Sequence, residues 1–93
     1  MKVKIEDYGF YDDKGYVIYK IADLSLDQLR FLDENIEEKT LLNEKEKYLI
    51  LTMYYDKRFF PFESTESKEK LEDYIAREEI EIYIFISSYL EDF

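Results

Sequence analysis

The stretch that decides the fold is EEIEIYIFISSYLEDF, residues 78–93. Isoleucine stands at every second position from 80 to 86, and the residues between are Glu81, Tyr83 and Phe85. Such alternation is typical of a strand with one buried face. It predicts a final strand over about 80–87, with the isoleucines facing a core and Tyr83 and Phe85 on the other face.

Working back along the chain, the patterns predict the order β-β-α-β-α-β. KVKIE (2–6) alternates, and YVIYKIA (16–22) is rich in β-branched and aromatic residues, so both are predicted strands. The DDKG between them has the chemistry of a tight hairpin, in which Gly15 would supply a positive φ. KYLILTMYY (47–55) is apolar on both faces and predicts a central strand.

Two helices are predicted between these strands. In the first, Ser25 is an N-cap and Gln28 completes a capping box. Its apolar stripe consists of Leu29, Leu32 and Ile36. The second helix is predicted at about 65–79, with an inner stripe of Leu71, Tyr74 and Ile75 and three candidate caps, Ser64, Thr65 and Ser67.

These elements predict an α+β fold in a single domain, residues 1–93, with a four-stranded mixed sheet and both helices on one face. The other face would be open. Aromatic residues of the remaining strands could join Tyr83 and Phe85 there, namely Tyr16, Tyr48 and Tyr54. The rings either cover one another as cross-strand pairs or form a binding or dimer face.

The composition argues against catalysis. The chain has no Cys and no His, which removes the thiolate nucleophile, the commonest general base and common transition-metal ligands. With only two Gly it cannot form a glycine-rich phosphate loop. Asp12 and Asp13 lack the alternating spacing of a calcium loop. We therefore predict a non-enzymatic protein with no metal and no cofactor.

The charge is strongly acidic. There are 23 Asp and Glu against 13 Lys and Arg, a formal net charge of −10. Carboxylates at i, i+3 and i+4 of a helix lie about 5–6 Å apart, so they can imitate a row of phosphates. Two helices side by side would present a row of carboxylates to the basic groove of a partner. These carboxylates are Asp27, Glu34, Glu38, Glu66, Glu69 and Asp73. The alternative is a solvated surface that keeps the protein soluble.

The segment KRFFPFE (57–63) is the second unusual stretch. Pro61 cannot lie inside a strand ladder, so it ends the preceding strand. Its three Phe either fill the core beneath the second helix or form an exposed loop with Arg58 and Phe60 as anchors.

The first residues, MKVKIEDYGF, lack the apolar segment of a signal peptide. No apolar run approaches the roughly 20 residues that span a bilayer. We expect a soluble, cytoplasmic protein. Its negative charge disfavours direct contact with nucleic acid or anionic lipid and favours basic partners.

In size, acidity and helix-borne carboxylates (DENIEE, 33–38; ESKEKLEDYIAREE, 66–79) the chain resembles small phage-encoded inhibitors of bacterial defence. These include anti-CRISPR and anti-restriction proteins that imitate DNA. Bacterial immunity proteins and antitoxins that cover basic toxins look similar. The resemblance is one of composition, so it carries over no functional residue. It implies a viral inhibitor, such as an anti-CRISPR protein, that acts in the host cytoplasm by occupying the basic groove of a nucleic-acid-binding protein.

A second functional hypothesis comes from the aromatic face. In it the chain is a protein–protein interaction or homodimerisation module that docks through Tyr83 and Phe85, in the manner of an immunity protein, antitoxin or adaptor, and the acidic residues only keep the surface soluble. The two hypotheses differ in which surface binds.

Overall fold

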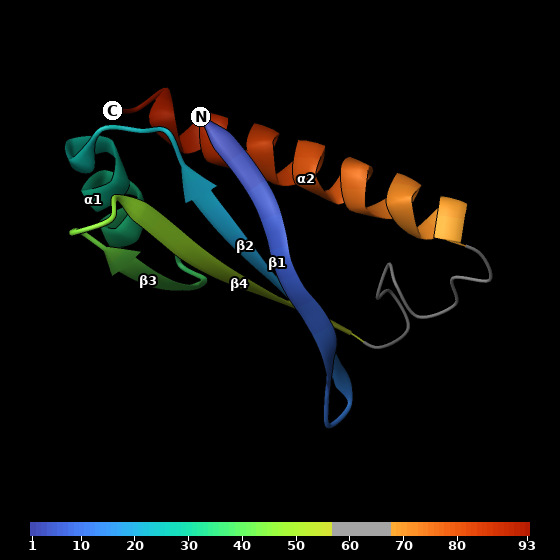
Figure 1. The fold of residues 1–93 in the computed structure, drawn as a ribbon. Coiled ribbons are helices and arrows are strands. Elements are labelled where there is room, and N and C mark those ends of the chain that lie inside the picture. Colours follow the sequence, from blue (N-terminus) through green and yellow to red (C-terminus); the bar gives the residue numbers. More distant parts are fainter. Residues whose placement is uncertain (57–67) are drawn as a thin grey trace.

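The computed structural model describes residues 1–56 and 68–93, which form an α+β fold (Figure 1). The strands are β1 (Lys2–Tyr11), β2 (Lys14–Ala22), β3 (Lys39–Asn43) and β4 (Tyr48–Asp56). The helices are α1 (Leu26–Asn35) and α2 (Lys68–Leu90). The predicted class is confirmed, because the described residues form four strands and two helices in the order β-β-α-β-β-α.

The four strands form one sheet in the order β1-β2-β4-β3, and every neighbouring pair is antiparallel. The sheet is therefore not mixed. The first hairpin pairs Tyr11 with Lys14, so its loop is only Asp12–Asp13. Asp12 takes the positive φ of 53°, a conformation that Asp tolerates. The prediction for Gly15 was wrong, because Gly15 already lies in β2 opposite Tyr55.

Helix α1 begins as its sequence predicts. The Ser25 hydroxyl accepts the N–H of Gln28, and the Gln28 side chain accepts the N–H of Ser25. The helix ends at Asn35, and Ile36 is an extended C-cap. The carboxylates of Glu37 and Glu38 were predicted on the helix, but they follow it.

The end of the chain differs most from its prediction. Residues 80–87 are not a strand, because α2 continues without a break to Leu90. Ile82 and Ile86 are buried, whereas Ile80 and Ile84 are exposed. Alternate residues lie about 200° apart on a helix of 3.6 residues per turn, so the isoleucine alternation divides between two opposite sides of α2. The chain has no Gly or Pro between 68 and 90 that would end the helix.

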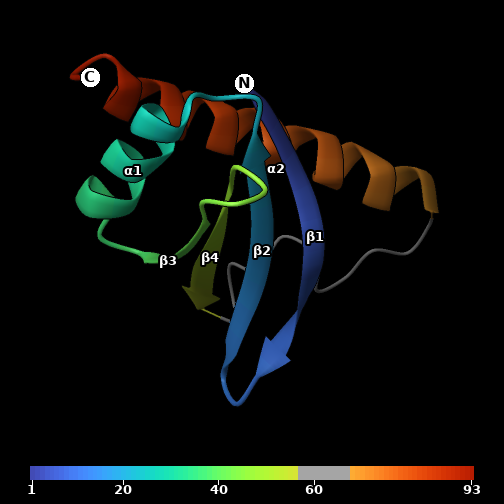
Figure 2. The same cartoon turned by 60° about the vertical axis from the view of Figure 1, so that its left-hand side comes forward.

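Both helices cover the same face of the sheet (Figures 1 and 2). The core between the layers comes from β2, β4 and both helices, and consists of Val17, Tyr19, Ile21, Leu29, Leu32, Ile36, Leu49, Leu51, Ile82 and Ile86. Helix α1 lies near the C-terminal end of α2, where the rings of Phe31 and Phe93 meet edge to face at 5.5 Å. The prediction that one sheet face carries both helices is thus confirmed.

Candidate functional site

The open face of the sheet is the candidate site. Its side chains follow from the strand register, because residues opposite the buried core positions point away from the helices. One row across the strands is Lys4, Lys20, Ile50 and Leu41. The next row is Asp7, Ile18, Thr52 and Lys39. A third is Gly9, Tyr16 and Tyr54.

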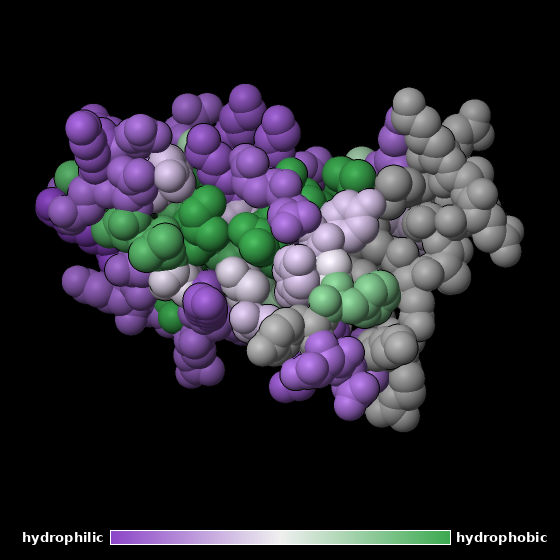
Figure 3. All heavy atoms as spheres, turned by 60° about the horizontal axis from the view of Figure 1, so that its bottom comes forward, coloured by the Kyte–Doolittle hydropathy of each residue, from purple (hydrophilic) through white to green (hydrophobic). Residues whose placement is uncertain are grey.

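An apolar band crosses this face. Figure 3, seen from this side, shows hydrophobic residues gathered across the strands with hydrophilic residues around them. Ile18, Ile50 and Leu41 come from three different strands, and Leu41 is 69% exposed. A sheet with one uncovered face normally carries polar residues there. The band is therefore an unpartnered apolar surface.

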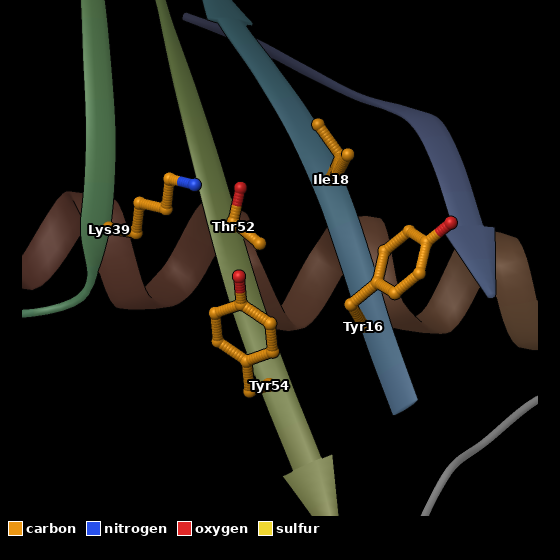
Figure 4. A pocket seen from close by; sticks show the side chains of 5 residues that line it. All are labelled: Tyr16, Ile18, Lys39, Thr52 and Tyr54. Carbon is orange, nitrogen blue, oxygen red and sulfur yellow. The ribbon is translucent and has the colours of Figure 1, made fainter. Parts of the chain in front are cut away.

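Beside the band lies a shallow hollow of about 290 Å³ (Figure 4). Its lining comes from β2, β3 and β4 and consists of Tyr16, Ile18, Lys39, Thr52 and Tyr54. The two tyrosines are cross-strand neighbours. Tyrosine offers a large, rigid contact area with a hydroxyl at its tip, which suits a binding surface.

The absence of a side chain at Gly9 leaves room for the ring of Tyr16. A Cβ at position 9 would lie 2.8 Å from the Tyr16 hydroxyl oxygen and 3.0 Å from its Cζ. The ring of Tyr16 therefore lies over the neighbouring strand, where any side chain at Gly9 would displace it. A glycine in a strand interior often marks such a close approach.

Four lysines share the open face with the apolar band, and two of them, Lys20 and Lys39, adjoin it. Lys4 and Lys20 lie directly opposite each other on β1 and β2, although like charges in that position destabilise a sheet. The Lys20 ammonium stands 4.6 Å from the centre of the Tyr48 ring. Among residues 1–56 and 68–93, the lysines of this face, Lys2, Lys4, Lys20 and Lys39, form no ion pair. The face also carries acids, because Asp7 lies opposite Ile18 and Glu6 and Asp23 line a hollow with Lys2, Lys4 and Lys20. Bases still outnumber acids on the open face, in contrast to the chain as a whole.

The structure does not gather the predicted acidic surface. Asp27 and Glu34 are exposed on α1, and Asp27 lies 3.8 Å from Arg30. Asp73 is exposed near the start of α2, about 25 Å along the helix axis from the end that meets α1. The two sets of carboxylates therefore lie at opposite ends of the molecule (Figure 1).

The remaining predicted carboxylates divide three ways. Glu38 follows α1 and is half-buried, and its Oε2 is buried without a hydrogen-bond partner among the described residues. Glu69 lies in the first turn of α2. Glu66 lies outside the described residues, as do the segment 57–63 with Arg58, Phe60 and Pro61 and the candidate caps Ser64, Thr65 and Ser67.

The predicted aromatic pair is not on the open sheet face. Tyr83 and Phe85 belong to α2, on the other side of the sheet. Tyr83 is 45% exposed. Phe85 packs against the core and meets Tyr89 edge to face at 5.2 Å. These two positions were assigned to the wrong surface, because period 2 was expected where the helical period holds.

Two features of the candidate site were not predicted. The lysines of the open face belong to strands whose alternation was recognised only in part, and β3, which supplies Leu41 and Lys39, was missed. Tyr16, Tyr48 and Tyr54 do point to the open face, as the sequence suggested. The signal that could have found the lysines is the alternation KVKI at 2–5, continued through Lys20.

A half-buried group of polar side chains lies under α2. The hydroxyls of Tyr19 and Tyr55 are 3.4 Å apart, and Glu78 hydrogen-bonds to Tyr55. Burial, and then the nearby carboxylate of Glu81, raise the pKa of Glu78 above its usual range. Burial also raises the pKa of Tyr19 and of Tyr55. This group faces the core, away from the open face.

In the part of the chain that the structure describes, no three acidic residues come together as metal ligands. No described helix combines the length and apolarity that crossing a membrane requires.

No curated protein matches the sequence. A family described as "Family of unknown function (DUF5750)" matches residues 2–92, almost the whole chain. The protein therefore belongs to the DUF5750 family.

Proposed function

We propose that this protein is a non-enzymatic binding module that docks a partner protein on the open face of its sheet. The observation that carries the proposal is the apolar band of Ile18, Ile50 and Leu41. Its border consists of Tyr16, Tyr54, Lys20, Lys39 and Asp7. Desolvated apolar and tyrosine side chains within a polar rim are the usual anatomy of a protein interface.

The charge pattern supports the same surface. The facing lysines Lys4 and Lys20 cost stability, and no carboxylate within the described residues forms an ion pair with either. Local rules are broken most often where a function compensates the cost. A partner with an apolar strip between carboxylates would satisfy both the band and the lysines.

Site-specific photocrosslinking tests the proposal. A photoreactive phenylalanine analogue replaces Leu41 or Tyr54 on the open face, and Asp27 or Glu34 on α1, one position at a time. The protein is expressed in cells and irradiated, and its adducts are identified by mass spectrometry. We expect a defined protein adduct from the two sheet positions and none from the two α1 positions.

A matched control separates specific docking from general stickiness. Phe93 is large, apolar and 59% exposed, but it lies beside α1, away from the sheet face. The same adduct from position 93 would mean non-specific capture and would count against the sheet face. Adducts confined to positions 27 and 34 would overturn the proposal in favour of the acidic surface.

We propose one second candidate, an inhibitor that covers the basic groove of a nucleic-acid-binding protein, as an anti-CRISPR protein does. One observation favours it. The Phe31–Phe93 contact brings Glu91 and Asp92 to the same end of the molecule as the carboxylates of α1 (Figure 2). This acidic end is smaller than the two-helix surface that the sequence predicted. Charge reversal at Asp27 and Glu34 would weaken that inhibitor's binding and leave sheet-face docking unchanged.

A further inference from the structure

A second exposed apolar surface lies on α2, on the side away from the sheet. Ile80 is 61% exposed, Ile84 is 63% exposed, and Tyr83 lies beside them. We call these three residues the α2 ridge. Positions i, i+3 and i+4 form a continuous stripe on a helix. The isoleucines that point to the core, Ile82 and Ile86, lie on the opposite side of the same turns.

The carboxylates around the α2 ridge are the complement of the lysines on the open face. Asp73 and Glu81 are exposed on the same helix, and Glu91 is exposed just beyond its end. Arg77, the one base close to the ridge among the described residues, lies 4.8 Å from the Tyr74 ring. One surface of the molecule is therefore apolar with a rim in which bases outnumber acids, and the other is apolar with a rim in which acids outnumber bases.

The two surfaces also fit in size. From Ile80 to Ile84 the α2 ridge is about 6 Å long. The apolar band crosses β2, β4 and β3, two strand spacings, so it is about 10 Å long. The ridge can therefore lie along the band, with Lys20 on one side and Lys39 on the other.

We infer that the open sheet face binds the α2 ridge of a second copy of this chain. The inference rests on the proposed function, because it uses the same sheet face and names its occupant. In this contact the second copy's α2 covers the open face much as the protein's own helices cover the other face. The lysines of one copy then lie near the carboxylates of the other, and the paired Lys4 and Lys20 gain opposite charges.

The geometry makes this contact head-to-tail. Helix α2 covers the face of the sheet opposite the open face (Figure 1), and the α2 ridge is on the side of that helix away from the core. In a linear assembly, the copy at one end keeps an unused open face and the copy at the other end keeps an unused α2 ridge. Heterologous contacts of this type build rings or open chains instead of closed two-fold dimers. Association should grow with concentration and weaken with salt.

Two single variants test the inference. Leu41→Glu places a carboxylate on the open face against the acidic rim, and Ile84→Lys places an ammonium on the α2 ridge against the lysines. Each introduces a repulsive charge at an exposed position, so the fold is retained, which circular dichroism checks. Sedimentation velocity measures assembly over a range of concentrations. We expect each variant to weaken association by at least about tenfold.

The decisive measurement is an equal mixture of the two variants. The Ile84→Lys chain keeps an intact open face, and the Leu41→Glu chain keeps an intact α2 ridge. We expect the mixture to form a one-to-one heterodimer and to stop there, because one intact contact remains. Asp27→Lys on α1 is the control for a charge change elsewhere, and it should assemble like the unaltered protein.

Each other outcome overturns the inference. If the Leu41→Glu variant dimerises alone, two copies join ridge to ridge; if the Ile84→Lys variant does so, they join sheet to sheet. If the unaltered protein stays monomeric, the inference that a second copy occupies the open face is also rejected. If the protein is a monomer and its sheet positions crosslink to a different protein, the proposed function stands and only the second copy as occupant is rejected. If the protein is a monomer and the sheet positions give no adduct, both the proposed function and this inference are rejected.

Discussion

The carboxylate of Glu79 on α2 accepts the backbone N–H of Ile5 on β1 at 2.9 Å, across a sequence separation of 74 residues. β1 is an edge strand, and its register shifts just after this point, between Ile5 and Asp7. The bond therefore ties α2 to the edge of the sheet and engages an N–H of an edge strand. Free N–H groups on an edge strand can pair with another chain.

Removing this bond should destabilise the protein. We expect Glu79→Ala to lower the free energy of unfolding by about 1–2 kcal/mol, because the half-buried N–H of Ile5 loses a charged acceptor. Urea denaturation measures the change. Glu72→Ala, at an exposed position of the same helix, is the control and should change stability by less than about 0.5 kcal/mol. Equal effects would show that Glu79 acts only as a surface residue.

Glu78 should make stability depend on pH. Its pKa is raised in the folded protein, chiefly by burial and then by Glu81, so the folded state holds its proton to a higher pH than the unfolded chain does. Stability from this group is full below the unfolded pKa of about 4.3 and is lost as pH rises through the folded pKa. We expect Glu78→Gln to flatten that part of the stability profile measured by thermal unfolding. A profile unchanged by Glu78→Gln would contradict this.

The two sides of α2 can be told apart by one pair of substitutions. Ile86 is fully buried, so Ile86→Ala should cost about 2–5 kcal/mol. Ile84→Ala, two positions earlier, should change the stability of the monomer by less than about 0.5 kcal/mol. In a strand, both residues would lie on the same face and cost alike. Denaturant unfolding at low protein concentration measures the difference.

Gly9→Ala should alter binding without unfolding the protein. The new Cβ would meet the far end of the Tyr16 side chain, which can rotate away. The stability change should stay within about 1 kcal/mol, since alanine also has less backbone entropy to lose than glycine. NMR should show the Tyr16 ring signals shifted, and crosslinking from position 54 should fall. An unmoved Tyr16 ring would refute this placement.

Local sequence signals were enough to predict the elements in the first half of the chain. Ser25 and Gln28 mark the start of α1 because their capping bonds are made within four residues. The β1–β2 hairpin follows from alternation on both sides of the two aspartates. In contrast, β3 has five residues and no strong pattern, and it is a strand because it pairs with β4 from Lys39↔Thr52 to Asn43↔Tyr48. Pairing with a distant strand is not visible in so short a segment.

The candidate site was harder to predict than the fold. Isoleucine alternation at 80–86 fits both a strand and a helix that is apolar on two sides, and only tertiary packing chooses between them. That one misassignment moved Tyr83 and Phe85 to the wrong surface. Lys4 and Lys20 face each other because of the register between their strands. The sequence pattern predicts which face of the strand a residue lies on, but not which residue of the neighbouring strand lies opposite it.

The strand order has a consequence for how the chain folds. Each outer strand pairs with its neighbour in the sequence, so the β1–β2 and β3–β4 hairpins need only short loop closures. The β2–β4 pairing, which sets Val17 opposite Met53, joins the two hairpins at a higher entropic cost, because it closes a longer loop. We expect that joining step to limit the folding rate, with central residues of β2 and β4 already in contact in the transition state and α2 docking afterwards.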